Sequence, residues 1–254
     1  MDTNIFFIAL IGAMFGAASG YLGSFMILKR MSLVGDALSH VALPGIAIAL
    51  SFGINPMLGA FATLLVATFG IWYLAEHSDI YPEAIVGVFF TASLAIGLLI
   101  TPEPELLEAL FGNIDNIGLL EGTVVAIGAV TIFLVASSIS KKLLLSVVSE
   151  DLAKSQKINV SKINLIYLLM VSLVVAMGVK FLGTLLTGAM VIIPAVVAKK
   201  FANNTKVFQL VSVIVGALVS VIGILIAKYF GISSGPAVVL TAVSAFIIGY
   251  FIRK

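Results

Sequence analysis

Nine apolar runs separated by short polar segments dominate the chain. They cover about residues 4–28, 32–53, 56–75, 82–101, 121–140, 162–180, 183–198, 207–228 and 235–252. A helix of roughly 20 apolar residues crosses a hydrocarbon core about 30 Å thick, and most of these runs approach or exceed that length. Only Phe181 and Leu182 separate the sixth run from the seventh, so the turn between them must be tight. The pattern predicts an all-α polytopic membrane protein with roughly eight or nine transmembrane helices in a single domain, residues 1–254.

Composition supports a membrane protein and excludes the kinds of site that depend on cysteine. Of 254 residues, 61% are hydrophobic and only 10% are charged, and the mean hydropathy is +1.22. No soluble domain of this length has such a balance. The chain has no cysteine, which excludes a disulfide framework, a thiolate zinc site and a haem attachment motif.

Basic residues give the orientation. If the N-terminus is outside and the runs alternate, 12 of the 14 basic residues fall in the cytoplasm and 2, Lys180 and Lys228, fall outside. The 12 are Lys29, Arg30, Lys141, Lys142, Lys154, Lys157, Lys162, Lys199, Lys200, Lys206, Arg253 and Lys254. This is the asymmetry of the positive-inside rule. We therefore predict a multi-pass protein of the cytoplasmic (inner) membrane whose C-terminus is cytoplasmic.

The second run contains an acid and a histidine four residues apart, Asp36 and His40, with Ser39 close to their face. Residues at i and i+4 lie on one side of a helix. Zinc, manganese and ferrous iron all accept a carboxylate and an imidazole. At about 1.5 Å per residue, His40 lies roughly 15 Å beyond Arg30, near the bilayer centre. Ionisable residues at this depth are functional by default, so we predict a metal or proton site; pairing with neighbouring helices is the structural alternative.

A proline follows this pair at a spacing that repeats later in the chain. Pro44 cannot donate to the carbonyl of His40, and Pro194 stands in the same relation to Met190. A freed carbonyl at membrane depth is tolerated where it lines a cavity or is buried in protein. We therefore include Ser39, Pro44, Met190 and Pro194 as candidate pathway or gating residues, although a lone methionine is more often a packing residue.

Two connections are long enough to meet other molecules. The outer one, about residues 101–121, is acidic, contains no basic residue and includes a stretch, residues 106–111, that could form a short helix. The inner one, about residues 141–162, contains Ser149 as a helix cap, followed by Glu150 and Asp151 in a first turn. We predict a short helix on the cytoplasmic surface there, either a linker or a docking site. His77, in a cytoplasmic turn, is more typical of a solvated loop than of a ligand.

Absent motifs narrow the function. The sequence has no G-x-x-x-x-G-K-[ST], no H-E-x-x-H and no nucleophile elbow. It therefore holds neither an ATP-binding P-loop nor the site of an intramembrane protease, and we predict no enzyme activity. No basic aromatic surface suggests a nucleic-acid partner.

The segment around Asp36 and His40 resembles a known family. Residues 29–45, KRMSLVGDALSHVALPG, are similar to the hallmark segment of the zinc/manganese/iron ABC-transporter permeases. Weaker similarities follow in order at residues 110–114, 150–153 with 158–160, 180–195 and 234–237. The resemblance covers nearly the whole chain.

The resemblance implies a fold, a transport mechanism and partners. The fold would be that of the vitamin-B12 importer type of ABC permease. Two copies of the chain would form the path for a transported divalent ion (Zn, Mn or Fe), with no permanently bound cofactor. A separate ABC ATPase would dock on Glu150 and Asp151, and an extracytoplasmic metal-binding protein would dock on residues 101–121. Asp36 and His40 of each copy would meet near the dimer axis.

Two other classes remain open from the residues alone. A secondary, proton-coupled metal carrier could use Asp36 and His40 as a proton relay. A structural or receptor-like membrane protein would need neither residue for transport. The metal is also open, because the three candidates share oxygen and nitrogen ligands.

Overall fold

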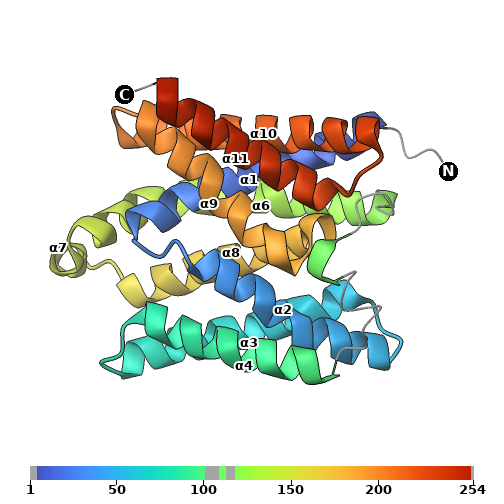
Figure 1. Ribbon diagram of the computed structural model, residues 1–254. Coiled ribbons are helices and arrows are strands. Elements are labelled where there is room, and N and C mark those ends of the chain that lie inside the picture. Colours follow the sequence, from blue (N-terminus) through green and yellow to red (C-terminus); the bar gives the residue numbers. More distant parts are fainter. Residues whose placement is uncertain (1–4, 101–108, 113–117, 253–254) are drawn as a thin grey trace.

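The computed structural model describes residues 5–100, 109–112 and 118–252, and the described part has helices but no strand. Nine of its helices are long and apolar enough to cross a membrane. In chain order they are α1 (Ile5–Leu28), α2 (Val34–Ser51), α3 (Pro56–His77), α4 (Pro82–Ile100), α6 (Leu119–Val148), α8 (Val160–Leu182), α9 (Thr184–Phe201), α10 (Thr205–Phe230) and α11 (Ser234–Ile252) (Figure 1). The predicted all-helical polytopic architecture is confirmed.

Polar residues and glycines between the apolar runs set the helix ends. The side chains of Asn55, Asn159 and Asn204 each accept a hydrogen bond from a backbone N–H in the first turn of the helix that follows. These caps satisfy donors that have no partner inside the helix. Gly231 ends α10 in the left-handed conformation, with φ +64°, which glycine adopts without steric strain.

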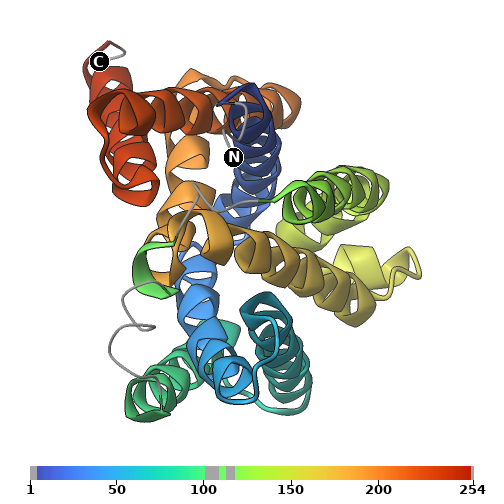
Figure 2. The ribbon, with the colours of Figure 1, turned by 90° about the vertical axis from the view of Figure 1, so that its right-hand side faces the viewer.

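Helices α2, α8 and α9 form the centre of the protein. Buried residues make up 78% of the α2 span and 72% of the α8 span, but only 17% of the α4 span. Viewed along the helices, α3 and α4 lie on one side of α2, while α10 and α11 lie on the far side of α9 (Figure 2). Helix α1 packs on α10 so closely that a Cβ at Gly16 would lie 2.2 Å from the carbonyl oxygen of Gly216. Small residues allow such close packing of helices in lipid.

The predicted short helix in the inner connection is present as α7 (Glu150–Ser155). Ser149 caps it by accepting a hydrogen bond from the Leu152 N–H at 3.2 Å. Helix α7 lies at the same end of the molecule as the end of α11, and α1 begins at the opposite end (Figure 1). This arrangement agrees with an odd number of crossings among the described helices; the orientation in the membrane stays a prediction.

Two boundaries differ from the sequence prediction. Helix α6 continues to Val148 instead of ending near residue 140, because Lys141 and Lys142 are good helix formers that extend it beyond the apolar run. Phe181 and Leu182 are not the turn between α8 and α9: both are helical, and Gly183 alone breaks the helix, with φ +80°. In the acidic connection, Glu103, Glu105, Glu108 and Asp115 lie outside the described residues, and residues 109–111 are helical.

Candidate functional site

Asp36 and His40 lie on α2, the most deeply buried span. His40 is 8% exposed, and Asp36 is half-buried in the first turn of the helix. They lie four residues apart, on the same face of the helix. Among the described residues, the Asp36 carboxylate makes no hydrogen bond or salt bridge, so it remains available as a ligand. The structure thus brings together the two residues that the sequence selected.

The His40 ring is held from one side by an aromatic residue. Phe90 of α4 meets it edge to face, with 5.2 Å between ring centroids. The Nδ1 atom is buried and has no hydrogen-bond partner among the described residues. A buried nitrogen without a partner is unfavourable in an apolar interior. A bound cation, or a proton donor supplied by another molecule, would satisfy it.

Helix α9 closes the other side of the pair. A Cβ at Gly188 would lie 2.4 Å from Asp36 Cα, so the α9 backbone packs directly on Asp36. One turn earlier, Ser39 Oγ contacts the Thr184 carbonyl oxygen at 2.5 Å and the Asp36 carbonyl oxygen at 2.7 Å. The Ser39 hydroxyl therefore ties α2 to the first residue of α9.

Both internal prolines are accommodated inside continuous helices. Pro44 and Pro194 are buried, and α2 and α9 continue past them to Ser51 and Phe201. Met190 is fully buried. At about 100° per residue, Met190 points about 200° away from Gly188, the residue that packs on Asp36. This geometry favours a packing role for Met190.

One chain offers an incomplete metal site. In the described ranges, no group of three or more His, Cys, Asp or Glu side chains could hold a metal ion. Zinc usually takes four ligands, and manganese often takes six. His77, predicted to lie in a cytoplasmic turn, is instead the last residue of α3. It adds no ligand here, because it is exposed and stacks on Tyr73, with 4.3 Å between ring centroids.

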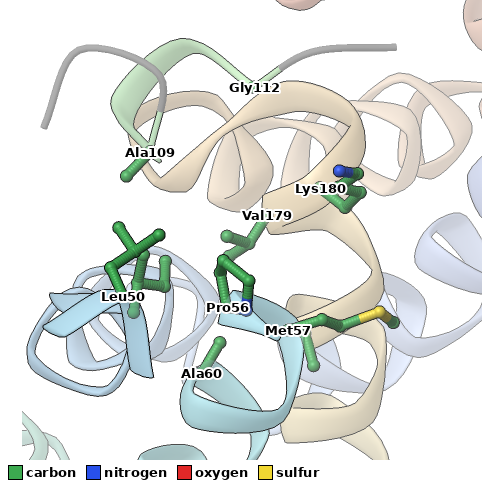
Figure 3. A pocket seen from close by; sticks show the side chains of 10 residues that line it. Leu50, Pro56, Met57, Ala60, Ala109, Gly112, Val179 and Lys180 are labelled. Carbon is green, nitrogen blue, oxygen red and sulfur yellow. The ribbon is translucent and has the colours of Figure 1, made fainter. Parts of the chain in front are cut away.

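An apolar cavity of about 130 Å³ lies further along α2, between α2, α3 and α8. Figure 3 shows Leu50, Pro56 and Val179 around it, with the segment of Ala109 and Gly112 on its upper side. Ile46, which also lines it, is about 9 Å beyond His40 along the helix. Lys180 stands at the cavity, and its Nζ lies 3.4 Å from Glu121 Oε1.

At the opposite end of the molecule, the predicted docking residues lie on α7. Glu150 forms a salt bridge with Lys154 at 2.8 Å, and both side chains are more than half exposed. Asp151 and Leu152 are also exposed. Helix α7 therefore offers a mixed charged and apolar surface to another molecule, while Ala153 holds it to the rest of the protein through a fully buried side chain.

Phe90 and Thr184 are site residues that sequence reasoning missed. Phe90 is one of many aromatic residues in apolar runs, and Thr184 acts through its backbone carbonyl. Neither has a distinguishing local pattern. Their proximity to the Asp36–His40 pair depends on which helices pack together.

Comparisons with known proteins agree along the whole chain. Residues 1–253 match the ABC 3 transport family. The manganese import system permease protein ScaB of Streptococcus gordonii is 34% identical over 249 residues, 96% of this chain and 90% of ScaB. The high-affinity zinc uptake system membrane protein ZnuB of Buchnera aphidicola is 30% identical over 254 residues, 98% of this chain and 97% of ZnuB. The solved structure of PsaBC from Streptococcus pneumoniae in complex with Fab matches with a TM-score of 0.86 and 32% identity, covering 100% of this chain and 93% of that chain.

Proposed function

This chain belongs to the ABC 3 transport family, and from that premise we propose that it is the membrane-spanning permease subunit of an ATP-driven importer of manganese or zinc ions. The observation that carries the proposal is the Asp36–His40 pair on the buried face of α2. A half-buried carboxylate and a buried imidazole nitrogen without a partner, on an apolar helix, fit a divalent cation in transit. The family match favours this function over a proton-coupled carrier that uses the same two residues.

The translocation path would contain two copies of the chain. The described part of one copy supplies two ligands at this position, fewer than either metal usually takes. In a two-fold dimer each surface patch occurs twice, so a second copy would bring the count to four. The missing P-loop assigns ATP hydrolysis to a separate ATPase chain. We place that ATPase on α7, through Glu150, Asp151 and Leu152, and an extracytoplasmic metal-binding protein on the opposite end of the molecule.

Uptake by the reconstituted complex tests the site. In proteoliposomes that hold permease, ATPase and binding protein, Asp36→Asn and His40→Ala should each lower ATP-dependent uptake of radioactive manganese or zinc at least about 100-fold, because each removes a ligand that the path requires. The matched control is His77→Ala, which removes the exposed histidine and should leave uptake unchanged. Wild-type uptake rates in both site variants would make Asp36 and His40 structural residues.

Cysteine labelling tests the orientation. The chain has no native cysteine, so Ser155→Cys at the end of α7 carries a unique thiol. A membrane-impermeant reagent added outside intact cells should leave it unmodified and should react only after permeabilisation. Modification from outside would reverse the proposed topology.

A further inference from the structure

A basic residue at the end of α1 turns into the protein instead of toward water. Lys29 directly follows the last residue of α1, and its Nζ lies 2.5 Å from Asn164 Oδ1 of α8. The same ammonium group sits 5.3 Å from the centre of the Tyr167 ring. A lysine at a membrane boundary usually extends its head into solvent, so the inward direction of Lys29 is a specific feature of this packing.

Lys29 faces the coupling region across an open cavity of about 460 Å³. The cavity is lined by residues of four segments: the end of α6, the start of α7, the start of α8 and the α1–α2 connection. The charged groups that line it are Lys29, Arg30 and Glu150. Burial lowers the pKa of Lys29 to about 8, and the negative charge of Glu150 opposes that shift. Lys29 is thus bonded to α8 and attracted to α7 at the same time.

The connection from Lys29 to α2 is short and well bonded. Arg30 adopts a left-handed conformation, with φ +58°. The Arg30 N–H donates to the Ile27 carbonyl at 3.2 Å and the Met31 N–H donates to the Met26 carbonyl at 3.0 Å, the pattern of a Schellman helix end. At the start of α2, a Cβ on Gly35 would lie 3.2 Å from Met26 Cε, so α2 begins in contact with the last turns of α1. The connection therefore offers a short route from Lys29 to the first turn of α2, which contains Asp36.

We propose that Lys29 is a positioning residue that transmits movement of α7 to the start of α2, and through it to Asp36 and His40. The inference rests on the proposed function, because it assigns the route by which an ATPase bound at α7 would reach the metal site. Lys29 itself touches neither the ATPase surface nor the metal ligands. Its amine acts through the charge attraction to Glu150 and the hydrogen bond to Asn164.

The number of metal ions imported per ATP hydrolysed tests this role. In proteoliposomes whose ATPase side faces the buffer, Lys29→Met should lower that ratio about tenfold at pH 7 while ATP hydrolysis continues. Lys29→Arg should preserve the ratio, because guanidinium keeps the positive charge and the donors. The matched control is Lys162→Met, which removes an exposed lysine from the first turn of α8 and should behave as the wild type.

The pH profile separates charge transmission from simple packing. A lysine with a pKa of about 8 is mostly charged at pH 7 and mostly neutral at pH 9, so the wild-type ratio should fall about fivefold across that range. In Lys29→Arg the number of ions imported per ATP should not change over this pH range, because arginine does not titrate there. If Lys29→Met fails to assemble, the pH profiles of the wild type and of Lys29→Arg are sufficient to test the transmission role.

Different outcomes overturn the two levels of the proposal. A wild-type ratio in Lys29→Met, or the wild-type pH profile in Lys29→Arg, would overturn the transmission role and leave the proposed function intact. A wild-type complex that imports neither manganese nor zinc would overturn the proposed function itself.

Discussion

The two ends of the helix bundle are closed in opposite ways. At one end three glycines, Gly112, Gly183 and Gly235, bring backbone against backbone; we call this the glycine junction. At the other end, Lys29, Asn164 and Glu150 face one another around an open cavity; we call this the α7 joint. At the glycine junction backbone meets backbone directly, whereas at the α7 joint charged side chains surround an open space.

The glycine junction fixes the corner between α8 and α9. A Cβ at Gly183 would lie 2.0 Å from the Leu110 carbonyl oxygen, and a Cβ at Gly112 would lie 2.4 Å from the Gly183 nitrogen. A Cβ at Gly235, at the start of α11, would lie 2.9 Å from the carbonyl oxygens of both Leu182 and Phe111. The carbonyl of Thr184, the next residue after the corner, accepts a hydrogen bond from Ser39, which lies beside the candidate site residues Asp36 and His40. The rigid end is therefore linked by one hydrogen bond to the candidate site.

The two ends of the bundle are therefore suited to different kinds of movement. Backbone packing resists displacement until a whole segment moves, because close-packed interiors leave no free volume. Charged side chains around a cavity can change partners with small motions, since attraction extends over several ångströms. The α7 joint suits the reception of graded movement from the ATPase that we propose to dock there, whereas the glycine junction suits a change in which a whole segment moves at once.

Substitution at the glycine corner should have the largest effect. Gly183→Ala places a methyl group against the Leu110 carbonyl at a backbone conformation (φ +80°, ψ 169°) that is nearly exclusive to glycine. We expect a loss of about 3 kcal/mol or more in stability, measured as thermal unfolding in detergent. The matched control is Gly231→Ala, which also has a positive φ but meets nothing within 4 Å. It should lose only about 1 kcal/mol. Equal losses of stability in the two variants would mean that backbone strain at a positive φ, and not contact with the Leu110 carbonyl, accounts for the effect at Gly183.

Removing the link between the corner and the site should have an intermediate effect. Ser39→Ala leaves the buried Thr184 carbonyl without the donor that it has in the wild type, which should lower stability by about 1–2 kcal/mol and reduce metal uptake. Ser51→Ala is the control on the same helix, since Ser51 bonds only to the Ala47 carbonyl of its own helix. Unaltered uptake in Ser39→Ala would separate the corner from the site.

Loss of the cap of α7 should have the smallest effect. Ser149→Ala removes the acceptor of the Leu152 N–H, a local loss of about 0.5–1 kcal/mol. Amide hydrogen exchange at Leu152 should become about two- to fivefold faster, while global unfolding hardly changes. Ser155→Ala, which lacks only a bond to the Leu152 carbonyl, serves as the control. A large drop in global stability would show that the α7 joint is as rigid as the glycine junction.

Much of this fold was predictable because its physics is local. Apolar runs of membrane length give the spanning helices, and a serine before two acids gives the start of α7. The Asp36–His40 pair was predictable for the same reason, since a spacing of four residues places both on one face of any helix. Their role in binding metal stays a prediction.

The features that were not predictable depend on partners distant in the sequence. Lys29 was expected at the membrane boundary, but its inward direction depends on Asn164, 135 residues later. Phe90 reaches His40 only because α4 packs on α2. The corner at Gly183 was predicted one to two residues too early because a glycine beside an apolar run is compatible with either a helix start or a break. Each of these features depends on which helices pack together, and hydrophobic periodicity does not contain that information.

The single-residue corner also bears on how the protein is made. Helices α8 and α9 together span residues 160–201 with only Gly183 between them. While α9 is still being synthesised on the ribosome, no loop separates it from the end of α8. We therefore expect the two helices to enter the membrane together as one hairpin, with Lys180, in the last turn of α8, near its tip. Insertion of this pair would then be a single event in biogenesis, and its timing would depend on completion of α9.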